Sequence, residues 1–156
     1  MRRIEPRIVP GAPGAETLER RLYLTLGKLT GVLLKRMAAH ALAAIERERA
    51  RLDGLNVFPV PDGDTGTNMA LTLRAALGGV SAEHLAEAAR QMAHGALRGA
   101  RGNSGTILSQ FVEGFSQGVA GLGEAGPLEV ARALVRAAEV AYQAVVEPQE
   151  GTMLTV

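Results

Sequence analysis

The chain has no cysteine and very little net charge. The absence of cysteine excludes disulfide bonds, thiol nucleophiles and thiolate metal ligands, and it is compatible with a reducing cytosol. No hydrophobic run is long enough to cross a bilayer, and the N-terminus lacks the apolar core of a secretory signal. We therefore expect a soluble, cytoplasmic protein without a membrane span.

Positive and negative charges almost cancel, because 17 Lys and Arg residues stand against 16 Asp and Glu residues. A formal charge of +1 is too small to argue for nucleic acid or an anionic membrane as a partner. The positive charge comes mostly from arginines spread along the chain, and no basic stripe with interleaved aromatic residues appears. We expect no nucleic-acid partner.

Hydrophobic residues make up 47% of the chain, and they recur at spacings near three and four rather than two. The pattern predicts helices over about 22–52, 68–77, 82–97, 104–117 and 127–146, joined by glycine-rich loops. Thr67 or Asn68 and then Ser81 are the expected N-caps of the second and third helices. We predict an all-α fold, an antiparallel bundle with short loops, after a flexible segment over residues 1–21.

Aspartate is rare, and two of the three aspartates stand one residue apart in the loop Asn56–Met69. Carboxylates on a tight loop suit Mg²⁺, and N–H groups at a helix start suit phosphates. The loop therefore predicts a magnesium–nucleotide site with Asp62 and Asp64 as metal ligands. Asn56 would add a carbonyl ligand or orient a water. The residues expected to donate to phosphate oxygens are Thr65, Thr67 and Asn68.

A second glycine loop, Gly99–Gly105, runs into the next helix. Ser104 would cap that helix or donate to a phosphate, and Arg101 would reach a phosphate from within the loop. The loop is neither a P-loop nor a Rossmann fingerprint, since it lacks the Gly-Lys-Ser/Thr sequence and no strand precedes it. Alone it would be more typical of a helix connection, but two such loops favour a shared nucleotide site.

Two other interpretations of the acidic loop fit the sequence less well than a magnesium–nucleotide site. An Asp-Gly pair is an ordinary turn signal. An EF-hand would use Asp62 and Asp64 at its first and third positions, but Thr67 replaces its glycine and Leu73 its glutamate. The three phenylalanines are expected to be core residues rather than an adenine clamp; they are Phe58, Phe111 and Phe115.

The segment Leu55–Met69 resembles the first motif of the N-terminal kinase domain of bacterial fatty acid kinase. That domain is related to the DhaL (Dak2) ATP-binding domain of dihydroxyacetone kinases. Gly99–Gln110 is similar to the second motif, and Glu150–Val156 to a third. The resemblance covers about residues 29–156. It implies a helical barrel of the DhaL type that binds ADP or ATP with two magnesium ions.

The resemblance also implies roles for individual residues. Asp62 and Asp64 would be the catalytic and metal-binding residues. The implied nucleotide contacts are Asn56, Thr65, Gly66, Thr67, Asn68, Asn103, Ser104, Thr152 and Met153. Asn56 is the nearest counterpart of a third aspartate of the dihydroxyacetone kinases, as in the fatty acid kinase branch, which argues against dihydroxyacetone as the substrate.

We expect residues 22–156 to form a DhaL-like nucleotide-binding domain. In a complete kinase it would transfer the γ-phosphate of ATP to a fatty acyl carboxylate presented by an acyl-carrier (fatty acid-binding) protein. The family domain continues beyond the motif at residues 152–156, so we expect the domain to be incomplete at its C-terminus. The alternatives are a truncated, non-catalytic helical scaffold that self-associates into a homo-oligomer, and a glycerone (dihydroxyacetone) kinase-like activity.

Overall fold

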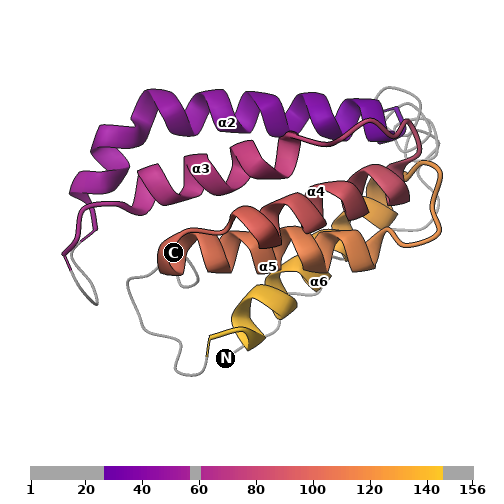
Figure 1. Cartoon of the computed structure of the whole chain (residues 1–156). Helices are drawn as coiled ribbons and strands as arrows, with labels where there is room; N and C mark the ends of the chain where they lie inside the picture. Colours follow the sequence, from indigo (N-terminus) through magenta and orange to yellow (C-terminus); the bar gives the residue numbers. More distant parts are fainter. Residues whose placement is uncertain (1–26, 57–60, 146–156) are drawn as a thin grey trace, which may run out of the picture.

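The computed structural model describes residues 27–56 and 61–145, and within these ranges it contains five helices and no strand. Successive helices run antiparallel (Figure 1), which confirms the predicted all-α bundle. The helices are α2 (Gly31–Gly54), α3 (Thr65–Leu77), α4 (Leu85–Gly99), α5 (Gly102–Gly118) and α6 (Pro127–Gln143). The predicted N-terminal segment, Phe58, Thr152 and Met153 lie outside the described residues.

The first helix begins later than its periodicity predicts. Leu29 exchanges two backbone hydrogen bonds with Ala125, of 2.8 and 2.9 Å, and is therefore extended rather than helical. Thr30 then caps α2, because its hydroxyl accepts the N–H of Leu33 at 3.3 Å. The prediction of a helix from Leu22 is wrong over residues 27–30, since pairing with the α5–α6 loop outweighs the local helical pattern there.

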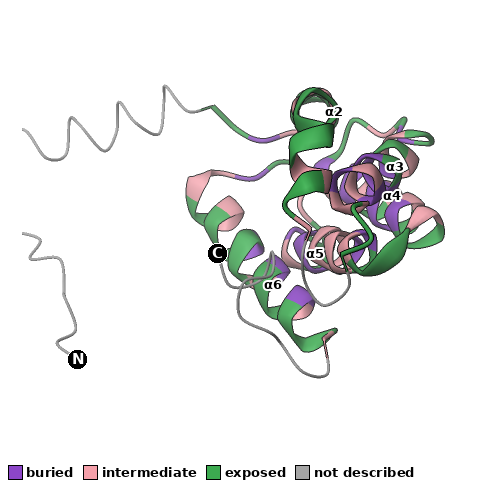
Figure 2. Ribbon diagram, turned by 90° about the vertical axis from the view of Figure 1, so that its left-hand side faces the viewer, coloured by how far each residue is buried: buried purple, intermediate pink, exposed green. Residues whose placement is uncertain are grey.

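Buried residues lie on the inner faces of α3, α4, α5 and α6 (Figure 2). Helix α2 packs against α3 and α4, and Gly31 is its one buried residue. One core cluster gathers around Leu85, Phe115 and Val119. A second cluster surrounds Leu73 and Met92 between α3 and α4. Phe115 is buried and Phe111 is half-buried against the first cluster, so both predicted core phenylalanines within the described residues are confirmed.

Helix α4 begins at Leu85, three residues after the predicted start at Ala82. The N–H groups of Leu85 and Ala86 donate to the carbonyls of Gly123 and Leu122, both at 2.9 Å. The α5–α6 loop thus supplies acceptors for the first N–H groups of α4. The position at which α4 begins is therefore set by its contact with the α5–α6 loop.

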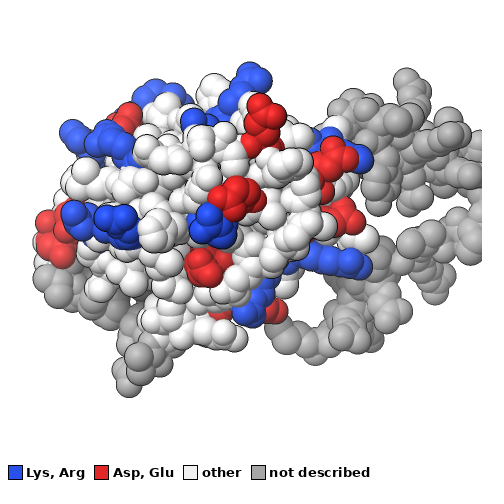
Figure 3. Space-filling view, turned by 45° about the vertical axis from the view of Figure 1, so that its right-hand side comes forward, with Lys and Arg blue, Asp and Glu red and all other residues white. Residues whose placement is uncertain are grey.

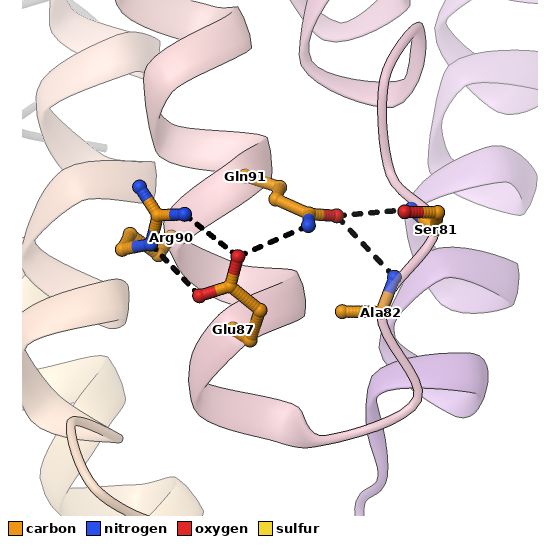
Figure 4. Close-up of polar contacts among 5 residues, drawn as sticks. All are labelled: Ser81, Ala82, Glu87, Arg90 and Gln91. Carbon is orange, nitrogen blue, oxygen red and sulfur yellow. Dashed lines mark hydrogen bonds and ion pairs between the residues drawn. The ribbon is translucent and has the colours of Figure 1, made fainter.

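The predicted N-cap Ser81 has a different role in the structure, which Figure 4 shows. The side-chain oxygen of Gln91 accepts the N–H groups of Ser81 and Ala82, at 2.9 and 3.3 Å. Gln91 donates in turn to Glu87 at 3.1 Å, and Glu87 also accepts two hydrogen bonds from Arg90. Side chains on α4 therefore hold the α3–α4 loop in a non-helical conformation.

Charged side chains of both signs are interspersed on the face that Figure 3 shows. Exposed ion pairs such as Arg74–Glu46 and Lys28–Glu124 bring opposite charges together. Such exposed pairs contribute little to stability, about 0–1 kcal/mol each. Among the described helices, none combines the length and apolar character needed to cross a membrane.

Candidate functional site

The two glycine loops predicted from the sequence lie at the same end of the bundle (Figure 1). The antiparallel order brings the ends of α2 and α4 to the starts of α3 and α5. At this end the hydroxyl of Ser104, on α5, lies 3.3 Å from the hydroxyl of Thr65, the first residue of α3. The fold thus joins two predicted phosphate-binding side chains that are 39 residues apart in the sequence.

The two aspartates of the first loop flank Gly63, whose φ of 63° lies in the left-handed region that favours glycine. Asp62 is exposed, and the side-chain amide of Asn56 donates to its Oδ1. Asp64 is half-buried and directly precedes α3, yet its carboxylate makes no capping hydrogen bond. Within the part of the chain that the structure describes, the Asp64 carboxylate is therefore not used to cap α3.

The donor set at this loop fits magnesium. Mg²⁺ is usually bound by one or two carboxylates, with water and phosphate oxygens completing its octahedral coordination. Within the described ranges no three His, Asp or Glu side chains gather into a ready-made cage for a metal. The two carboxylates that flank Gly63 match the small number of protein ligands that Mg²⁺ commonly takes beside a phosphate.

Asp53, in the last turn of α2, is the third aspartate of the chain, and the sequence pattern assigned it no role. Its Oδ1 accepts the N–H of Thr67 and its Oδ2 accepts the hydroxyl of Thr67, both at 2.9 Å. The N–H of Thr67 is the main cause that lowers the pKa of Asp53 below its usual range, and the N–H of Gly66 and the charge of Arg49 act in the same direction. A carboxylate from α2 therefore caps α3.

This cap explains why α3 begins at Thr65 rather than after the predicted N-cap Thr67 or Asn68. The acceptor for the third N–H of the helix comes from 14 residues upstream, so no local spacing reveals it. The only signal in the sequence is an aspartate at the end of one helix and a threonine at the start of the next. Their meeting depends on how α2 packs against α3.

The Asp53 cap makes stability depend on pH in a defined direction. Because the pKa of Asp53 is lowered on folding, its stabilising effect is complete above the unfolded value of about 4. It is lost as the pH falls through the lowered folded value. We expect the melting temperature of the wild type to exceed that of Asp53→Asn at pH 7, and the difference to shrink between pH 5 and pH 3. A difference that stays constant over this range would contradict the assignment.

Three predicted nucleotide contacts on α3 have protein neighbours in the structure. Gly66 is buried, and a Cβ added there would lie 2.7 Å from the carbonyl oxygen of Arg49 on α2. Thr67 is bound to Asp53 through both its N–H and its hydroxyl. Asn68 is only 8% exposed, and its side-chain amide lies against Gly102 of the second loop. These residues join α2, α3 and α5 at the site.

The second loop is held on α3 by Thr72, which the sequence analysis did not single out. The buried Thr72 hydroxyl donates to the carbonyl of Asn68 at 2.8 Å and accepts the N–H of Arg101 at 3.3 Å. Helix α5 begins at Gly102, where φ is 57°, two residues before the predicted start. Asn103 is exposed and Ser104 is half-buried, so both stand at the edge of the site.

Comparison with known proteins gives the family of the chain. The DAK2 domain matches residues 59–156. An uncharacterized protein of Staphylococcus epidermidis is 40% identical over 134 residues, which are 84% of this chain and 24% of that protein. Protein YloV of Bacillus subtilis is 40% identical over 136 residues, 85% of this chain and 25% of YloV. The chain spans about a quarter of the length of these curated relatives. It belongs to the DAK2 (DhaL-type) domain family, a family of kinase-associated nucleotide-binding domains.

Proposed function

We propose that this domain binds the magnesium complex of ATP or ADP at the end of the bundle where α3 and α5 begin. The observation that carries the proposal is the Thr65–Ser104 contact beside the Asp62–Asp64 loop. It unites hydroxyl donors, acidic metal ligands and a helix start in one place. Membership of the DAK2 family supports a nucleotide as the ligand.

Asp62 and Asp64 hold the magnesium, and we propose two ions as the resemblance implies. Magnesium bound there neutralises negative charge on the phosphate chain. Asn56 orients Asp62 through its side-chain amide. Asp64 occupies the N-cap position of α3, next to the phosphate-binding Thr65.

The phosphate chain is bound mainly by Thr65, Asn103 and Ser104. The start of α5 also contributes, since the side chain at its N-cap, Arg101, makes no capping hydrogen bond and the helix dipole favours negative charge there. Three further residues support the phosphate site indirectly, because they hold the starts of α3 and α5 in place. These residues are Gly66, Thr67 and Asn68. The third motif lies outside the described residues. For it we propose what the resemblance implies, namely that Thr152 binds near the nucleotide and Met153 against its base.

In a complete kinase the reaction is phosphoryl transfer to a fatty acyl carboxylate presented by a carrier protein. A carboxylate oxygen forms a bond to the γ-phosphorus while the bond from that phosphorus to the β,γ-bridging oxygen breaks. The products are an acyl phosphate and ADP. The protein contributes positioning and charge neutralisation, so no nucleophilic side chain is needed. Asn56 in place of a third aspartate supports the acyl acceptor over dihydroxyacetone.

A thermal melt tests nucleotide binding directly. A ligand at ~100 times its dissociation constant adds about 2.7 kcal/mol to the free energy of unfolding, which raises the melting temperature measurably. We expect the rise with ATP and magnesium together, and a much smaller one with ATP and EDTA or with magnesium alone. The same melting temperature in all three conditions would contradict the proposed site. Formation of acyl phosphate from carrier-bound fatty acid then tests the acceptor.

A further inference from the structure

The start of α3 is capped by a residue from another helix. An N-cap side chain ordinarily accepts the N–H of the second or third residue of its own helix. Asp64 occupies the N-cap position of α3 but makes no such bond, while Asp53 on α2 accepts the N–H of the third residue, Thr67. We propose that Asp53 is a positioning residue that caps α3 in place of Asp64, and so leaves the Asp64 carboxylate for the metal. The metal part of this inference rests on the proposed function.

Capping α3 and binding a metal would compete for the same carboxylate oxygens of Asp64. A carboxylate that caps its own helix turns toward the helix start, and one of its oxygens accepts a backbone N–H. Asp53 makes this unnecessary, because one of its oxygens takes the N–H of Thr67 and the other takes its hydroxyl. With both oxygens engaged, Asp53 is held in one orientation. The positive end of the α3 dipole is then already neutralised without Asp64.

Close packing of α2 against α3 is what allows Asp53 to reach Thr67. A Cβ on Gly66 would lie 2.8 Å from the Cβ of Leu52 and 2.7 Å from the carbonyl oxygen of Arg49, so only glycine permits this approach. The backbone N–H of Asn56 also donates to the carbonyl of Asp53, at 3.2 Å. The end of α2 therefore orients both metal-loop aspartates, Asp62 through Asn56 and Asp64 through the substitute cap.

The test compares Asp53→Ala with a matched control, Glu48→Ala. Both variants remove one acidic side chain from the last two turns of α2, but Glu48 is exposed and, among the described residues, pairs with Arg51. The measurements are the magnesium affinity in the presence of ATP and the ATP affinity in EDTA. In Asp53→Ala we expect the magnesium dissociation constant to rise about tenfold or more, as for other residues that orient a metal ligand. The ATP affinity of Asp53→Ala in EDTA should match that of the wild type. In Glu48→Ala, the magnesium affinity and the ATP affinity in EDTA should both match the wild type.

Equal magnesium affinity in Asp53→Ala and Glu48→Ala would overturn the inference. So would an equal loss of metal-dependent and metal-free binding in Asp53→Ala, because that pattern indicates general disruption of the site. If Asp53→Ala does not fold, Asp53→Asn replaces it. The asparagine keeps one acceptor oxygen but lacks the charge, so a smaller loss in the same direction is expected, and no loss counts against the inference.

A second readout separates this inference from the proposed function. Hydrogen exchange at the Thr67 amide reports the cap whether or not a nucleotide binds. Faster exchange of this amide in Asp53→Ala than in Glu48→Ala supports capping by Asp53, and equal exchange overturns it. A wild type that binds no magnesium nucleotide would overturn the proposed function and the role of Asp64, while the exchange result still decides which residue caps α3.

Discussion

Asp64→Asn and Asp62→Asn should each abolish magnesium-dependent ATP binding while leaving the ligand-free melting temperature almost unchanged. An asparagine offers one neutral oxygen in place of a carboxylate, and Mg²⁺ relies on few protein ligands, so each is important. Residues that only orient a ligand contribute 10–100-fold to metal affinity. We therefore expect losing a ligand itself to cost about 100-fold or more. Isothermal titration of each variant with ATP, with and without magnesium, measures this loss of affinity.

The fold should tolerate both changes because neither carboxylate makes a hydrogen bond that caps α3. Asp62 is exposed, and Asp64 makes no capping hydrogen bond. Glu48→Gln is the matched control, since it neutralises an exposed acidic residue on α2 outside the site. Undiminished magnesium-dependent binding in either aspartate variant would remove that residue from the metal site. A large drop in the ligand-free melting temperature would show a structural role instead.

Gly118→Ala should destabilise the bundle more than a single added methyl group normally would. A Cβ at Gly118 would lie 2.5 Å from the Cα and 2.8 Å from the Cβ of Ala133 on α6. Both are fixed atoms close to the backbone, and α5–α6 is the most extensive helix contact among the described residues. Overpacking of this kind costs about 1–3 kcal/mol. At about 2–4 °C per kcal/mol for a domain of this size, thermal unfolding resolves it.

Gly79→Ala is the control for this change. Among the described residues, no heavy atom lies within 4 Å of a Cβ added at Gly79, and the φ of Gly79 is not positive, so the alanine fits without strain. Gly79→Ala should be neutral or slightly stabilising, because alanine restricts the unfolded chain. If the two variants melt at the same temperature, close packing at Gly118 does not limit the stability of the bundle.

Much of the helical framework could be predicted because its signals are local. The apolar spacing of three to four residues predicted helices where the structure has them, and the glycine loops marked their ends. Boundaries were less predictable. Leu29 is extended because it pairs with Ala125, and α4 begins at Leu85 because carbonyls of the α5–α6 loop accept its first N–H groups. Both partners are distant in the sequence, so no local pattern contains them.

The sequence by itself determined the helix class, the acidic loop with Asp62 and Asp64, and the resemblance that led to a nucleotide. Each depends on residues that are close together along the chain. The tertiary structure alone decided that Asp53 binds Thr67 and that Thr72 holds the second loop. The reason is physical: a hydrogen bond needs its donor and acceptor within about 3 Å. For residues on different helices, only the packing of those helices brings them that close.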